Sequence, residues 1–246
     1  MRKTLILARR ELAAYFVSPM AYVIGALFLC ACGFKFAPVP GSADEWFVMV
    51  PGRVVALRPL FDMMAMAMVV AAPLLTMRLL SDEFRTGTIE TLMTAAVTDT
   101  QVILGKFLGV LGFYAALLAG TLPLVVVMAI FARPDWGVAA MGYLGMMLLG
   151  SAFLAVGLFA STLTRHQLLA AVTGAAILGT FGLLMPFLVP KAPEPFNEFA
   201  RQVSVMTYFK DFTRGRLDTR GLAFFLVATV LFLFLSVKTL ESRRWR

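Results

Sequence analysis

The chain has 246 residues, of which 60% are hydrophobic and only 15% are charged, and its formal net charge at pH 7 is +8. These proportions exclude an ordinary soluble domain, in which about a quarter of the residues are charged, and they indicate a single integral membrane domain. The positive charge is expected to act on membrane orientation and lipid headgroups, because the sequence contains no basic stretch interleaved with aromatic residues of the kind that binds nucleic acid.

Six apolar runs approach or exceed the roughly 20 residues that a helix needs to cross a bilayer. They are residues 20–37, 60–80, 107–131, 138–163, 167–189 and 222–237. We therefore expect an all-α integral membrane fold with six transmembrane helices. An even number of crossings puts both termini on one side, and we assign that side to the cytoplasm because Lys and Arg residues flank the first and last runs closely. These residues are Arg2, Lys3, Arg9, Arg10, Lys238, Arg243, Arg244 and Arg246.

Residues 1–17 predict an amphipathic helix that lies at the inner membrane surface. Its apolar residues share one face at helical spacing, and charged residues lie opposite. The apolar face comprises Leu5, Ala8, Leu12, Tyr15 and Phe16, with Lys3, Arg10 and Glu11 on the other side. A signal peptide is the competing interpretation, which we disfavour because the apolar run starts late and lacks a small-x-small cleavage site.

Ser18 and Pro19 are expected to turn the chain into the first crossing, where Cys30 and Cys32 are interpreted as packing residues. Residues 38–59 form a predicted outer loop. Asp62 then opens the second crossing near its outer end, where a helix N-terminus tolerates an acid. We favour that interpretation over a proton-coupling role.

The stretch from Ser81 to Lys106 reads SDEFRTGTIETLMTAAVTDTQVILGK and is a polar stretch between two long apolar runs. Gly87 is placed where a helix end needs a residue that tolerates positive φ. Thr88 can cap a short helix over residues 89–95, and Thr98 with Gln101 forms a capping box that predicts a long third helix. Such a segment outside the bilayer offers a contact for a soluble partner.

The later crossings carry small residues and almost no charge. Gly105 and Gly109 form a small-xxx-small pair that permits close helix packing, either within the chain or at a dimer seam. The missing midplane charges disfavour a transporter driven by protons or sodium. Prolines after the fifth crossing end that helix, and residues 196–221 predict one or two short amphipathic helices resting on or dipping into the outer face.

Catalytic motifs are absent from the sequence. Gly105-Lys106 does not form a phosphate loop, because Thr100 stands where the loop has Gly and Phe107 where it has Ser or Thr. The sequence has no clustered metal ligands, and we expect no catalytic residue and no cofactor of its own. Any uphill movement would then draw its energy from another chain.

Three groups of residues carry a resemblance to a known family. They are Glu83-Phe84-Arg85-Thr86-Gly87-Thr88-Ile89-Glu90-Thr91-Leu92, then Val97-Thr98, then Gly105-Lys106. This order resembles the E-x-x-x-G-T-x-E-x-L…P-V-(S/T)…G-K signature of type-2 ABC transporter permeases, with Ala96 where the family usually has Pro. The tail from Tyr208 to Asp218, with Leu240 to Arg244, is similar to the branch of gliding-motility and nitrous-oxide-reductase-maturation permeases.

The resemblance implies a single transmembrane permease domain over residues 1–246, with residues 1–17 as an interfacial elbow helix and residues 190–220 as short outer re-entrant helices. Residues 88–96 would be the coupling helix, which seats in a cleft of an ATP-binding cassette ATPase. That partner would bind ATP and Mg, and a second permease subunit would complete a dimeric exporter in the bacterial inner membrane. The implied ATPase-coupling residues are Glu83, Arg85, Gly87, Thr88, Glu90, Leu92, Thr98 and Lys106.

Three other interpretations stay open at this point. The polar stretch could be an inner loop whose caps only order the chain. The protein could anchor or transmit mechanical force to an envelope, gliding or secretion complex, using the ATPase without moving a small solute. A secondary transporter is the third, and the uncharged membrane interior disfavours it.

Overall fold

The computed structural model describes residues 2–34, 54–55, 57–87, 98–131, 133–185 and 204–244. Within these residues the protein is helical, apart from one parallel pairing of two-residue strands, β1 (Val54–Val55) and β2 (Arg133–Pro134). Most of the predicted outer loop at 38–59, the predicted short helix at 89–95 and the first part of the outer segment, 190–203, lie outside the described residues.

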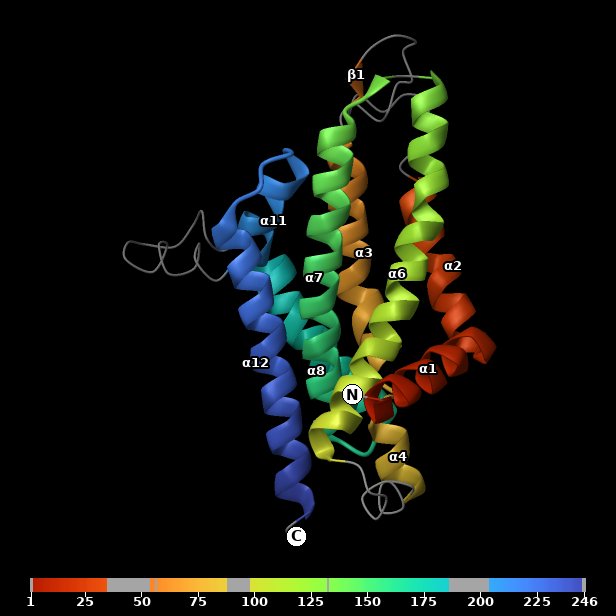
Figure 1. Ribbon diagram of the computed structural model, residues 1–246, viewed down its shortest axis with the longest axis vertical. Helices are drawn as coiled ribbons and strands as arrows, with labels where there is room; N and C mark the ends of the chain where they lie inside the picture. The colour runs from red at the N-terminus through yellow and green to blue at the C-terminus, as the bar shows by residue number, and fades with distance from the viewer. Residues whose placement is uncertain are drawn as a thin grey trace.

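The chain opens with two helices that meet at a sharp bend. α1 (Arg2–Val17) and α2 (Pro19–Phe34) are inclined by about 75° to each other. Pro19 takes the first position of α2, where its missing N–H is not needed. α1 crosses the bundle near the end that holds α4, and α2 runs up beside α6 (Figure 1). The predicted turn at Ser18 and Pro19 is therefore confirmed.

Long apolar helices form the bundle. They are α3 (Arg58–Thr76), α6 (Asp99–Phe131), α7 (Trp136–Leu163), α8 (Gln167–Gly179) with the π-helical turn η1 (Thr180–Leu184), and α12 (Thr219–Arg244). In the described part of the chain, five helices are long and apolar enough to cross a membrane, or six if the bent pair α1–α2 counts as one span. The first predicted crossing, residues 20–37, corresponds to α2, whose 16 residues are fewer than the 18 that α8 and η1 span together.

α7 lies at the centre of the bundle and packs against α3, α6, α8 and α12 (Figure 1). Its glycines make room for large rings from its neighbours. A Cβ at Gly142 would lie 2.2 Å from the Phe61 ring, and one at Gly150 would lie 2.1 Å from the Tyr114 ring. The small residues predicted to allow close packing in this crossing thus pack within the chain.

The boundaries of the last elements differ from the predicted ones. α12 continues beyond 237 to Arg244, and in this polar end the exposed Lys238 lies 2.7 Å from Glu241, a pair of the kind that adds modestly to helix stability. α8 and η1 end at Leu184, and residues 186–189 of the predicted fifth crossing lie outside the described residues. Of the predicted outer helices the structure describes one, α11 (Val205–Thr213), which packs against α7, α12 and η1.

Candidate functional site

The helix α4 (Ser81–Thr86) follows α3 after a tight corner, and α7 fixes that corner. The backbone N–H groups of Leu80 and Ser81 both donate to the hydroxyl oxygen of Ser161, each at 3.1 Å. Ser161 in turn donates to the Met77 carbonyl at 3.2 Å. All of these groups are buried, so the C-terminal end of α7 holds α4 in place.

Gly87 ends α4 in the left-handed conformation, with φ of +73°. A side chain at this position would be strained, which is why the sequence has glycine here. The predicted break is confirmed. The chain then enters residues 88–97, which include Thr88, Glu90 and Leu92 and lie outside the described residues.

The chain returns at Thr98 through the predicted capping box. The Gln101 backbone N–H donates to the Thr98 hydroxyl at 3.3 Å, and the Thr98 backbone N–H donates to the Gln101 side-chain oxygen at 3.5 Å. These bonds satisfy two amides that the first turn of a helix leaves free. The capping box is therefore confirmed as the start of α6.

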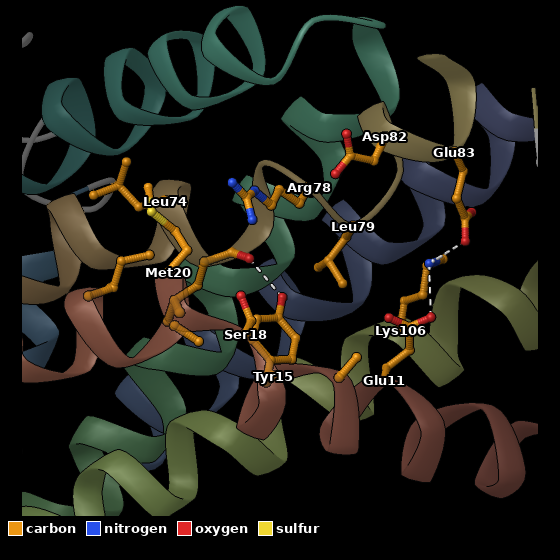
Figure 2. Close-up of a pocket in the computed structure, with 14 residues that line it drawn as sticks. Glu11, Tyr15, Ser18, Met20, Leu74, Arg78, Leu79, Asp82, Glu83 and Lys106 are labelled. Atoms are coloured by element: carbon orange, nitrogen blue, oxygen red, sulfur yellow. Dashed lines mark hydrogen bonds and ion pairs between the residues drawn. The ribbon is translucent and has the colours of Figure 1, made fainter. Parts of the chain in front are cut away.

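Lys106, in the second turn of α6, joins three helices. Its side chain is only 3% exposed, and its Nζ lies 2.7 Å from Glu83 Oε1 of α4 and 3.1 Å from Glu11 Oε1 of α1. The two carboxyl side chains are themselves 17% and 14% exposed. Figure 2 shows the ammonium group between the two acids. α1, α4 and α6 therefore meet at one buried cation.

Two acids share this one lysine, and neighbouring contacts offset part of the excess charge. Arg10, which is exposed, lies 3.0 Å from the Glu11 carboxylate. The second oxygen of Glu83, Oε2, is buried and has no hydrogen-bond partner among the described residues. A buried ion pair is sensitive to the loss of one member, because the remaining charge is left without compensation.

α1 reaches Lys106 by lying in a groove of glycines on α6. A Cβ on Gly105 would come within 2.7 Å of Leu7, and one on Gly109 within 2.6 Å of the Glu11 Cβ. The absence of side chains at these positions lets the two backbones approach closely. Gly105 and Gly109 thus lie at the α1–α6 contact within the chain, beside the ion pairs.

Glu11 does not lie where the sequence pattern had put it. The prediction placed it opposite Ala8, Leu12 and Tyr15, but it shares their side of α1 and faces α6. Positions 8, 11, 12 and 15 follow the i, i+3, i+4, i+7 spacing of one helical stripe. Leu5, by contrast, is 70% exposed and points away from the bundle.

A cavity of about 270 Å³ lies beside this junction, between α1, α2, α3 and α4. Lys106 and Glu83 line one part of it, and Arg78 and Leu74 line another (Figure 2). Tyr15 of α1 forms part of the cavity wall, and its hydroxyl donates to the Leu75 carbonyl at 2.7 Å. The end of the bundle that carries α4 therefore combines charged groups with a hollow between helices.

The remaining predicted residues lie on the surface of this end. Arg85 is exposed and lies 3.3 Å from Asp82, which also accepts a hydrogen bond from Gln167 of α8. Gly87 and Thr98 are exposed as well. Sequence reasoning missed Glu11 and Ser161; the one available signal was Lys106, since a lysine next to an apolar run calls for an acidic partner.

Residues 8–240 match the family model described as ABC-2 family transporter protein. No similar sequence is found among proteins with curated descriptions.

Proposed function

Because the chain belongs to the ABC-2 family of transporter proteins, we propose that it is the membrane-spanning permease subunit of an ATP-binding cassette exporter, driven by a separate ATPase subunit. The proposal assigns the ATPase contact to the segment that begins at α4 and ends at the Thr98 cap, with the coupling helix at residues 88–96. ATP and Mg would be bound by the partner, and two permease subunits would act side by side.

The single observation that carries this proposal is the three-helix junction at Lys106. Glu83 lies four residues before the Gly87 turn and Lys106 eight residues after Thr98, so the segment between them is held at both ends by one ion pair of 2.7 Å. A displacement of that segment would move α4 and α6 together, and the ion pair between Lys106 and Glu11 would transmit the movement to α1. In this way a partner that pushes on one short segment could shift the bundle between two arrangements.

The arrangement of charges supports the proposed orientation. α4 and the C-terminal end of α12 lie at the same end of the bundle, and α1 crosses near that end (Figure 1). Exposed Lys3, Arg9 and Arg10 on α1 and Lys238 on α12 add positive charge there. By the positive-inside rule this end would face the cytoplasm of a bacterial inner membrane, which is also where an ATPase subunit would bind.

The test is purification of the tagged full-length chain from its own membranes in mild detergent, followed by identification of the accompanying proteins by mass spectrometry. We expect an ATP-binding cassette subunit in about equal amount, and ATP hydrolysis that depends on both chains. A chain that comes out alone, also after crosslinking, would overturn the proposal.

A second candidate function is a membrane anchor that transmits mechanical force to an envelope complex. The apolar bundle favours it, because hydroxyl groups in the described core are taken up by hydrogen bonds within the bundle, as with Tyr114 and the Met146 carbonyl at 2.9 Å and Thr121 and Tyr143 at 2.9 Å. The tail at residues 208–218, which resembles that of the gliding-motility branch, supports the same candidate. ATP hydrolysis that responds to an envelope protein and never to a lipid or small molecule would favour it over export.

A further inference from the structure

A second cavity lies apart from the α4 junction, between α7, α8 with η1, α11 and α12. Its volume is about 290 Å³, and every residue that lines it is apolar. Five aromatic residues are part of the wall: Phe153 from α7, Phe181 from η1, and Phe224, Phe225 and Phe232 from α12. We call this cavity the α8–α12 crevice.

The α8–α12 crevice opens sideways. α8 and α12 each pack against α7 and hardly against each other, which leaves a gap between them. Val227 and Leu231 line the crevice from α12 and are 65% and 50% exposed, and Phe181 on the η1 side is also exposed. Because these helices span the membrane, the opening faces the hydrocarbon chains of the bilayer.

We propose that the α8–α12 crevice binds one acyl chain of a membrane phospholipid, with the phosphate group beside Arg220. Four residues of α12 follow one another at intervals of about one turn: Arg220, Phe224, Ala228 and Phe232. The last three line the crevice, and the exposed Arg220 lies on the same face of the helix at its N-terminal end. From 220 to 232 the helix rises about 18 Å, close to the roughly 15 Å depth of one leaflet of the hydrocarbon core.

The size of the crevice fits a hydrocarbon chain. A methylene group is about the size of a water molecule, whose volume is about 30 Å³, so a cavity of about 290 Å³ has room for about ten. A single acyl chain therefore fits in the crevice.

The lining excludes a polar occupant. The hydroxyls of Ser151 and Thr229, on the facing surfaces of α7 and α12, donate to the Leu148 and Phe225 carbonyls and lie 3.2 Å from each other. Both hydroxyls are thus bonded between α7 and α12, and neither residue lines the crevice. A polar ligand in the crevice would lose its hydrogen bonds to water without replacement. An acyl chain has no hydrogen bonds to lose when it enters the crevice.

The test uses the purified full-length chain in vesicles of phosphatidylcholine that contain a phospholipid with a photoreactive group near the end of one acyl chain. After illumination, the labelled residues are mapped by mass spectrometry. We expect most label on Ala228, Leu231 and Phe232, where the end of the chain would lie, and less on Leu226 and Val230, which do not line the crevice and are exposed to bulk lipid. Equal labelling of the two sides of α12 would overturn the proposal, regardless of the results with the variants.

Two matched variants sharpen the result. Ala228→Phe fills the crevice and should lower the crevice label about tenfold, the loss expected when roughly two buried methylenes are displaced. Val230→Phe also introduces a phenyl ring, but on the lipid-exposed side of the helix, and should leave the label unchanged. Equal labelling in the two variants would contradict the proposal.

The headgroup contact and the alternative occupant are tested separately. Arg220→Gln should lower the crevice label severalfold, and Arg220→Lys should restore most of it, because a lysine still pairs with phosphate as a point charge. If Val227→Cys forms disulfide-linked dimers in the membrane, the crevice faces a second copy of this chain and the lipid proposal is wrong.

Discussion

Lys106 Nζ and Glu83 Oε1 lie 2.7 Å apart and stand on opposite sides of the segment 88–97, so one ion pair closes the base of that segment. Glu11 extends the pair to α1 at 3.1 Å. Because the lysine is buried, the contact depends on all three residues being present. The first prediction therefore concerns what happens when the cation is removed.

Lys106→Met should destabilise the bundle by about 3 kcal/mol and abolish the coupling of ATP hydrolysis to transport. The substitution leaves two acids without their shared cation, and an uncompensated buried charge is costly. Thermal unfolding in detergent measures the first effect, and ATP hydrolysis with and without transport measures the second. Lys238→Met removes an exposed lysine from a surface pair and should change stability by less than about 1 kcal/mol.

A triple variant separates stability from coupling. Lys106→Met combined with Glu11→Gln and Glu83→Gln removes the buried charges together and should recover most of the lost stability, since a neutral replacement of a buried ion network is often tolerated. Transport should stay uncoupled. If the triple variant couples normally, the ion pairs have no part in transmission.

Gly109→Ala should destabilise the contact between α1 and α6 by about 1–3 kcal/mol, because its Cβ would lie 2.6 Å from the Cβ of Glu11 and the backbone of α1 lies directly behind. Gly33→Ala in α2 is the matched control, since a Cβ there meets nothing within 4 Å. That control should gain up to about 1 kcal/mol from helix propensity. Equal effects of the two alanines in thermal unfolding would show that α1 does not rest on α6.

The sequence predicted local features of this site better than its long-range contacts. The Gly87 turn and the Thr98–Gln101 capping box each depend on residues within three positions of one another, and local backbone chemistry decides them. The partnership of Lys106 with Glu11 joins residues far apart in the chain. The pattern of α1 alone placed Glu11 on the wrong side, because a stripe that faces another helix can include an acid when that helix supplies a buried lysine.

The membrane helices show the same division. The apolar runs located α3, α6, α7, α8 and α12, since the bilayer thickness sets a length that the composition reveals. The first apolar run, residues 20–37, was already among the shortest, in keeping with the 16 residues of α2. The π-helical turn at Thr180–Leu184 did not follow from composition, because the hydrophobicity of a segment does not set which backbone hydrogen bonds its helix makes.

Gly87→Pro should uncouple ATP hydrolysis from transport without unfolding the bundle. Proline fixes φ near −65° and cannot adopt the +73° of this residue, so the segment after α4 would leave in a different direction. Gly87→Asn should keep most of the coupling, because asparagine tolerates the left-handed conformation. Gly87 is exposed, so the free energy of unfolding, measured by thermal unfolding, should fall by no more than about 2 kcal/mol. Normal transport in the proline variant would contradict the proposed role of the turn.

Glu90→Arg should abolish co-purification of the ATPase subunit while the permease itself stays folded. Glu90 lies within the proposed contact segment, and reversing a charge there would put like charges together across an interface. Glu241→Arg makes the same reversal at the same end of the bundle, at the end of α12, and should leave co-purification intact. Retention of the ATPase by the Glu90 variant would move the contact away from this segment.

Ser161→Ala should destabilise the corner between α3 and α4 by about 2–4 kcal/mol, because two buried backbone amides, of Leu80 and Ser81, would lose their acceptor. Ser151→Ala is the matched control: its hydroxyl bonds to the Leu148 carbonyl and to Thr229 and accepts from no backbone amide, so we expect less than about 1 kcal/mol. Thermal unfolding measures both, and hydrogen exchange at Leu80 and Ser81 reports where the loss occurs. Faster exchange at these two amides with α12 unchanged would place the loss at the corner, whereas uniform acceleration along the bundle would mean that Ser161 supports the fold as a whole and does not position α4.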